Sequence, residues 1–224
     1  MSSLRKYTPA YWGHILGARS LRLWVEFIAI FIVAPIGLAF NLEPKYMFPA
    51  LWAWTFAGLI LLHFTNGFRW RQLLDWPAEK GWLRVAFMAV MVLSISLGFV
   101  LYLMPERIFD LPLNRPKIWV MIMLLYPLFS ALPQELMFRA LYFERYKEIL
   151  PARGLIAVNA ALFSFAHLLY GHPVVFLMTF VGGLLFARAY LRGEFVLATL
   201  LHSVAGNMIF TSGLGYLFYS GNIH

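Results

Sequence analysis

The chain has 224 residues, of which 62% are hydrophobic and 12% are charged. A soluble domain of this length cannot bury so much apolar surface, so most of the chain requires a bilayer as its solvent. The formal net charge is +8, but the Lys and Arg residues lie in short connectors between apolar runs, which is typical of membrane topology signals and argues against a nucleic-acid partner. The sequence has no cysteine, which excludes disulfides and cysteine-ligated metals.

Seven apolar runs predict an all-α fold, a polytopic transmembrane helical bundle. They cover residues 23–40, 47–64, 85–104, 117–138, 155–170, 174–191 and 195–213. About twenty residues rising about 1.5 Å each cross a hydrocarbon core of about 30 Å, and the shorter runs suit tilted or interior helices. The first run is as long as a full span, so we expect a retained helix rather than a cleaved signal peptide. Without internal repeats or linkers, residues 1–224 are expected to form a single integral membrane domain.

Two further segments are expected to lie on the membrane surface. Residues 4–22 and 68–84 interleave aromatic and basic side chains, which suits interfacial helices and equally suits aromatic-belt loops. Basic residues concentrate in the N-terminal arm and in alternate connectors, so the positive-inside rule places the N-terminus in the cytoplasm. The connector that holds Arg107, Arg115 and Lys117 opposes this bias. The expected location is an inner (plasma) membrane of bacterial type.

Ionisable residues inside three of the apolar runs carry the functional signal. Such groups cost about 2.5–3.5 kcal/mol each in a membrane helix and are rarely kept without a use. Glu135 and Arg139 are four residues apart, so they share a helix face and can pair. His167 follows Phe163 by four residues in the next run, and His202 lies in the last run. Together these side chains predict a site at hydrophobic depth.

The spacing around Pro151 predicts that Glu135 and His167 face each other. Each lies sixteen residues from Pro151, where a Pro-Gly pattern predicts a turn. In an antiparallel hairpin both side chains would then stand at one level, about 24 Å from the turn. A carboxylate facing an imidazole can activate water, bind a metal such as zinc with His202 as third ligand, or form a structural pair.

His202 opens a polar stretch that also contains Asn207. Two donors aimed at one point would form an oxyanion hole, whereas each could separately satisfy a neighbouring group. Five residues place Asn207 about 140° away from His202 around an α-helix, so convergence requires a π-bulge, for which Gly206 is the candidate. Otherwise Asn207 is structural.

At these residues the chain resembles the CPBP intramembrane protease family, also called the ABI family, which includes CAAX proteases of the type II prenyl endopeptidase kind and bacteriocin-processing enzymes. That family carries a Glu-Glu-x-x-x-Arg motif, a Phe-x-x-x-His motif and a later His with Asn nearby. The matching residues here lie within a core of residues 117–213 and are Gln134-Glu135-x-x-x-Arg139, Phe163-x-x-x-His167, and His202 with Asn207.

The resemblance implies an intramembrane endopeptidase of glutamate or metallo type. Glu135 with His167 would activate water, His202 with Asn207 would hold the oxyanion, and Arg139 would set the ionisation of Glu135. The implied cofactor is either none or a divalent metal such as zinc, held by the same carboxylate and two histidines. The implied partners are membrane lipids and a membrane-anchored, prenylated or leader-peptide substrate.

Gln134 departs from the family pattern, in which the first glutamate is usually given the water-activating role. A neutral amide cannot accept a proton, so either Glu135 serves as base with Gln134 in support, or the chain is catalytically impaired, or an introduced Glu→Gln substitution stands here. An impaired member would be a membrane scaffold or binding protein. A chain that used Glu135 and its histidines as a relay would instead be a proton-linked transporter.

Overall fold

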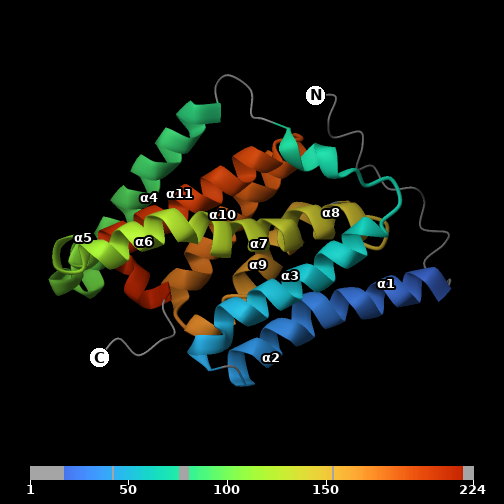
Figure 1. The fold of residues 1–224 in the computed structure, drawn as a ribbon, viewed down its shortest axis with the longest axis horizontal. Helices are drawn as coiled ribbons and strands as arrows, with labels where there is room; N and C mark the ends of the chain where they lie inside the picture. The colour runs from blue at the N-terminus through green and yellow to red at the C-terminus, as the bar shows by residue number, and fades with distance from the viewer. Residues whose placement is uncertain (1–17, 42, 76–80, 153, 219–224) are drawn as a thin grey trace.

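The computed structural model describes residues 18–41, 43–75, 81–152 and 154–218. These residues form an all-helical bundle without a strand, as predicted (Figure 1). Large hydrophobic side chains cover much of the exterior, among them Phe40, Phe87 and Leu124, which are 74%, 69% and 67% exposed. Such a surface is stable only in contact with lipid, so the chain is an integral membrane protein.

Within the described residues, each of the seven predicted runs contains a helix or most of one. The N-terminal helix comprises α1 (Ala18–Ile28), a π-helical segment (Ala29–Val33) and α2 (Ala34–Asn41), and it is followed by α3 (Met47–His63) and α4 (Gly81–Leu103). After the short α5 (Asp110–Asn114), one bent helix comprises α6 (Pro116–Tyr126), a π-segment (Pro127–Ala131), α7 (Leu132–Glu135), a second π-segment (Leu136–Leu141) and α8 (Tyr142–Arg145). The last three are α9 (Leu155–Phe165), α10 (Pro173–Leu191) and α11 (Phe195–Ser212). Short 3₁₀ turns lie at Pro44–Tyr46, Trp70–Leu74, Pro105–Arg107, Leu168–Tyr170 and Leu214–Phe218.

Five of these helices are long and apolar enough to cross a membrane, so the predicted number of about seven spans is not confirmed. The two shorter apolar helices are α3, with 17 residues, and α9, with 11. At about 1.5 Å per residue α9 extends about 16 Å, roughly half of a hydrocarbon core. The run 155–170 overestimates this helix because the chain leaves it after Phe165 and turns at Gly171, whose φ is +60°.

The expected surface segments are covered only in part. Residues 4–17 of the first segment lie outside the described residues, as do residues 76–80 of the second. Within the second segment the structure contains the 3₁₀ turn Trp70–Leu74 and the first turn of α4. The cytoplasmic placement of the N-terminus stays a prediction.

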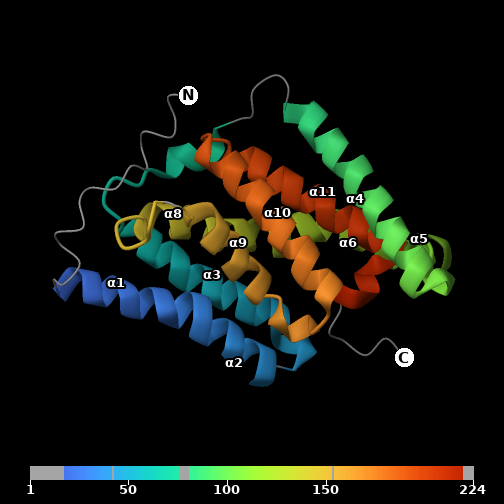
Figure 2. The ribbon, with the colours of Figure 1, turned by 180° about the vertical axis from the view of Figure 1, so that it is seen from behind.

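The bent helix α6–α8 is the centre of the bundle. The second π-segment packs against α3, the first packs against α11, and α4 covers the outer side of α11 (Figures 1 and 2). Proline explains part of this irregular backbone, because Pro127 and Pro133 supply no N–H to the carbonyls four residues earlier. Together with the second π-segment, these prolines leave the α-helical ladder interrupted on both sides of Gln134 and Glu135.

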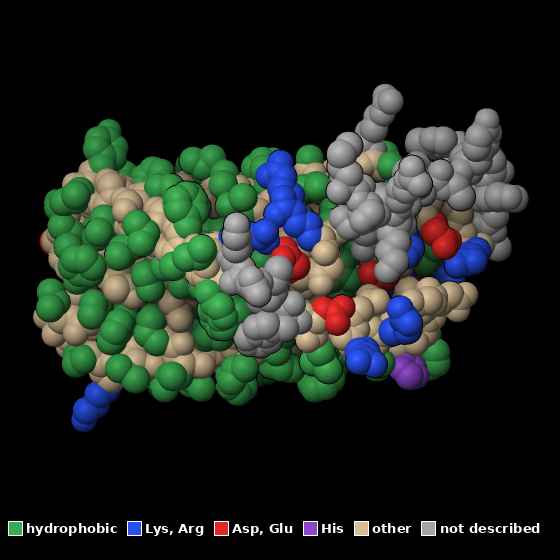
Figure 3. Space-filling model, turned by 90° about the horizontal axis from the view of Figure 1, so that it is seen from above, with side chains coloured by type: hydrophobic (Ala, Val, Ile, Leu, Met, Phe, Trp, Pro, Cys, Tyr) green, Lys and Arg blue, Asp and Glu red, His purple; other side chains and the backbone are tan. Residues whose placement is uncertain are grey.

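Charged side chains tie the first helices to the bent helix. On the face shown in Figure 3, basic and acidic side chains gather mostly over one half, and hydrophobic side chains cover the other. Arg145, at the end of α8, pairs with Glu26 of α1 at 2.7 Å and donates to the Leu61 carbonyl of α3 at 3.1 Å. One guanidinium thus holds α1, α3 and α8 together.

Replacing Arg145 by Ala is expected to destabilise the protein by about 3 kcal/mol, because it removes one partner of a largely buried ion pair. The Arg145 side chain is 7% exposed, whereas Arg22, which pairs with the same Glu26, is 71% exposed. Water screens the exposed pair, so Arg22→Ala is the matched control and should change stability little. Thermal unfolding in detergent measures both variants, and equal shifts in Tm would contradict this assignment.

Candidate active site

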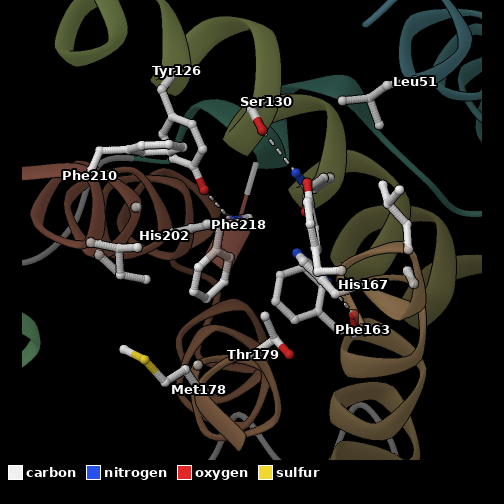
Figure 4. A pocket seen from close by; sticks show the side chains of 18 of the residues that line it. Leu51, Tyr126, Ser130, Phe163, His167, Met178, Thr179, His202, Phe210 and Phe218 are labelled. Atoms are coloured by element: carbon white, nitrogen blue, oxygen red, sulfur yellow. Dashed lines mark hydrogen bonds between the residues drawn. The ribbon is translucent and has the colours of Figure 1, made fainter. Parts of the chain in front are cut away.

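A cavity of about 990 Å³ opens among α2, α3, α4, the bent helix, α10 and α11 (Figure 4). Most of the lining side chains are apolar. Among the polar residues that line it are Tyr126, Ser130, Gln134, His167 and His202. An apolar cavity with a few convergent polar groups is the usual form of a binding or catalytic site.

Tyr126, Ser130 and Gln134 recur every four residues along the bent helix, and all three line the cavity. The Gln134 amide donates from Nε2 to Ser130 Oγ at 3.0 Å. Because an amide is neutral, it can stand on this apolar wall without a counter-charge. The position at which a carboxylate is expected from the resemblance is therefore the one that faces the cavity.

Glu135 turns the other way. Its side chain is fully buried and does not line the cavity. One oxygen, Oε1, lies 2.9 Å from His202 Nδ1, and the other, Oε2, lies 3.2 Å from Arg139 Nε. The predicted Glu135–Arg139 pair is confirmed. Among the described interactions, the carboxylate meets His202 rather than His167.

Arg139 is also fully buried and is held on several sides. Its Nη1 donates to Asn159 Oδ1 of α9 at 2.6 Å, and its guanidinium lies 4.9 Å from the centre of the Phe163 ring. Asn159 in turn donates from Nδ2 to the Phe138 carbonyl at 2.5 Å. A charge without water needs such partners, so this network fixes how α9 packs on the bent helix.

The contacts between the bent helix and α9 place Glu135 about one turn away from the expected register. Arg139 bonds Asn159, and the Tyr142 hydroxyl donates to the Leu155 carbonyl at 3.0 Å. Continuing these pairs brings the level of Glu135 opposite Phe163 rather than His167. The prediction that Glu135 and His167 stand at one level is wrong, because the helix pairing is not centred on Pro151 and α9 ends at Phe165, before His167.

Both histidines that line the cavity have their Nδ1 atoms engaged. His167 follows the end of α9, and its Nδ1 lies 2.8 Å from the Phe163 carbonyl oxygen. Carbonyl and carboxylate oxygens only accept, so Nδ1 carries the hydrogen in His167 and also in His202 beside Glu135. The remaining nitrogen of each ring is Nε2, and that of His202 lies 3.2 Å from the Tyr126 hydroxyl.

Two phenylalanines fix the histidine rings. Phe163 contacts His167 and His202 edge-on, with ring centres 4.9 and 5.4 Å apart. Phe186 of α10 stacks on His202 at 4.9 Å with an interplanar angle of 11°. The phenylalanine of the Phe-x-x-x-His motif therefore separates the two imidazoles and limits their rotation.

Asn207 has a structural partner. It donates from Nδ2 to the Met123 carbonyl at 3.2 Å, which is the carbonyl that Pro127 cannot serve because proline has no N–H. Helix α11 is regular from Phe195 to Ser212, so no π-bulge forms at Gly206 and the alternative of a structural Asn207 is the one that fits. The π-segments of this region lie in the bent helix. Asn207 does not line the cavity.

Sequence reasoning missed Tyr126. Its signal was available in its spacing, because it precedes Ser130 and Gln134 by four and eight residues. A second signal was Gly206, which stands four residues after His202 and leaves room beside it. Neither signal is specific without knowledge of which helices face each other.

The described residues do not assemble a metal site. They contain no group of three or more His, Asp or Glu side chains that could hold an ion. Both oxygens of Glu135 are directed to His202 Nδ1 and Arg139, and Glu135 does not line the cavity that His167 and His202 line. The donor set proposed from the sequence thus does not fit a three-ligand centre, and no zinc-dependent step is derived from it.

A family model matches the part of the chain that contains this site. Residues 116–208 match the family model described as type II CAAX prenyl endopeptidase Rce1-like. The match begins at the start of α6 and ends within α11, so it includes every predicted site residue. No curated protein and no solved structure matches the chain.

Exchanging Arg139 for Lys is expected to destabilise the fold by about 2–4 kcal/mol, because one ammonium cannot serve Glu135 and Asn159 in the geometry of a guanidinium. The control is Arg188→Lys on neighbouring α10, where the side chain is exposed. The unfolding midpoint in detergent measures the effect. An Arg139→Lys protein as stable as the control would show that the buried network does not hold α9.

Proposed function

We propose, on the premise that the chain belongs to the CAAX protease family through residues 116–208, that it is an intramembrane endopeptidase. Its substrate would be a membrane-associated or lipidated protein or peptide. The observation that carries the proposal is the set of polar groups Gln134, His167 and His202 on one apolar cavity. Peptide hydrolysis needs water activation and support of the carbonyl oxygen, and these groups can supply both.

The character of the cavity supports the substrate class. Its lining is mainly aliphatic and aromatic, and its volume of about 990 Å³ exceeds what one side chain fills. An apolar chain or a membrane-embedded peptide segment suits this lining, because neither would leave a polar group buried without a partner there. Prenylated C-terminal tails, leader peptides and membrane-anchored segments all meet this requirement.

In this proposal, His167 activates the attacking water. Its Nδ1 donates to the Phe163 carbonyl, so Nε2 keeps a lone pair that can accept a proton. A water held between His167 and Gln134 would lose a proton to Nε2 as its oxygen attacks the carbonyl carbon. The imidazolium would then return that proton to the leaving amine, which balances the reaction.

Glu135 would act through His202 rather than on water. Both carboxylate oxygens already have cationic or imidazole partners, so a direct role as base would require the side chain to leave them. Beside His202, the carboxylate orients the ring and stabilises its protonated form, as the third member of a catalytic triad does. His202 would then support the carbonyl oxygen.

His167→Ala is expected to lower kcat by about 10²–10⁴-fold without changing the unfolding midpoint, because it removes the proton acceptor. The matched control is His63→Ala, an exposed histidine at the end of α3 that does not line the cavity. Cleavage of a prenylated or membrane-anchored reporter peptide in proteoliposomes measures the rate. Full activity of the His167 variant would remove this residue from the mechanism.

Gln134→Glu is expected to raise kcat by about 10²-fold, because a carboxylate on the cavity wall can accept the proton that an amide cannot. Gln72→Glu, in the 3₁₀ turn Trp70–Leu74, introduces the same charge away from the cavity and should leave the rate unchanged. Reporter cleavage by the native chain and both variants measures this. An unchanged or lower rate with Gln134→Glu would contradict the assignment of position 134.

Gln134 also favours a second candidate function. If the native chain binds the reporter but cleaves it only after Gln134→Glu, the chain is a catalytically impaired member that acts as a membrane binding protein. The observation behind this candidate is that Gln134, which stands in place of the first motif glutamate, faces the cavity. Reporter binding by the native chain, measured by fluorescence anisotropy, separates this outcome from absence of any substrate interaction.

A further inference from the structure

The part of the proposed site that would face the substrate carbonyl oxygen lacks the second donor that the sequence predicts. Asn207 donates to the Met123 carbonyl and does not line the cavity. His202 would therefore face the carbonyl oxygen alone if the site contained only the predicted residues. A single donor provides much weaker support for an oxyanion than two converging donors.

Gly206 leaves space at the position one helical turn after His202. A methyl group added there would overlap the phenol end of Tyr126, including its hydroxyl oxygen. Since residues four apart share a helix face, any side chain at 206 would project beside His202. The volume that such a side chain would occupy is filled by Tyr126 from α6.

The Tyr126 hydroxyl is held at His202. It lies 3.2 Å from His202 Nε2, and its ring packs against Phe210 with centres 5.8 Å apart. Figure 4 shows the hydroxyl directed to His202, and both residues line the cavity. Glu135, His202 and Tyr126 therefore form one chain of polar contacts that ends on the cavity wall.

We propose that Tyr126 is the hydroxyl donor to the carbonyl oxygen of the scissile bond, a role for which the sequence suggested Asn207. This inference rests on the proposed endopeptidase function. When His202 is protonated, its Nε2 no longer accepts from the tyrosine, so the tyrosine hydrogen is free for the substrate. The Nε2–H and the tyrosine hydroxyl can then both donate to one carbonyl oxygen. No covalent bond to Tyr126 forms, and its proton stays on the oxygen.

Tyr126→Phe tests the donor because it removes the oxygen and keeps the ring beside Gly206. We expect kcat to fall by about 10²–10³-fold with little change in KM, as for the loss of one oxyanion donor. Tyr102→Phe is the control, since that side chain is 85% exposed on α4. Both are made in the native chain and in the Gln134→Glu parent. A Tyr126→Phe rate within twofold of the parent would overturn the inference.

A position swap distinguishes a donor from a packing role. Gly206→Asn alone should lose activity and stability, because the new side chain overlaps Tyr126. Adding Tyr126→Ala clears that space and leaves an amide donor four residues after His202. The double variant should therefore cleave at least tenfold faster than Tyr126→Ala alone. Failure of this rescue, with a double variant that unfolds at the parent temperature, would contradict the shared position.

The controls separate failure of this inference from failure of the proposed function. If the Gln134→Glu parent cleaves the reporter and Tyr126→Phe cleaves it equally well, only the tyrosine assignment falls. If neither the native chain nor that parent cleaves any reporter, the endopeptidase function itself is contradicted, and the donor role with it. Labelled-histidine ¹⁵N spectra add an independent reading, because loss of the hydroxyl should shift the His202 Nε2 resonance. An unchanged resonance would overturn the contact.

Discussion

The buried Glu135–Arg139 pair is the constraint on which the site depends. Both side chains have no exposed surface, so each charge has lost its water and needs protein partners. Arg139 obtains them from Asn159 on α9 and from the Phe163 ring, while Glu135 obtains one from His202 on α11. A pair of this kind contributes less to net stability than to choosing one packing of helices, because partly satisfied alternatives are costly. The imidazole positions follow from that choice.

The two adjacent positions 134 and 135 face different surroundings on an irregular stretch of the bent helix. Pro127 and Pro133 remove backbone donors, and π-segments lie on both sides of the short α7. The Met123 carbonyl freed in this way binds Asn207, which draws α11 against the bent helix. The irregular helix that carries Gln134 on the cavity wall therefore also binds the Asn207 side chain, which does not line the cavity. A side chain that hydrogen-bonds an unpaired backbone carbonyl is not available to a substrate.

Sequence patterns predicted what depends on local spacing. The helical runs follow from hydropathy, and the Glu135–Arg139 pair follows from a separation of four residues. The register against α9, the direction of Asn207 and the approach of Tyr126 to His202 were not predictable in the same way. They depend on where the bent helix pairs with α9, on a carbonyl orphaned in another helix, and on the missing side chain of Gly206. Each of these is a contact between elements that no single-helix period encodes.

Glu135 and Gln134 serve different purposes: Glu135 holds the buried network together, and Gln134 faces the cavity. The bonds of Glu135 lie in the interior, with Arg139 and His202, whereas Gln134 bonds Ser130 on the cavity wall. A change at Gln134 therefore alters charge beside the substrate without removing a partner from the buried network. The converse holds for Glu135, whose loss would leave the Arg139 charge uncompensated. The scaffold can thus hold the same imidazole geometry whether position 134 carries a carboxylate or an amide, and that one side chain determines whether the wall offers a proton acceptor besides the His167 imidazole.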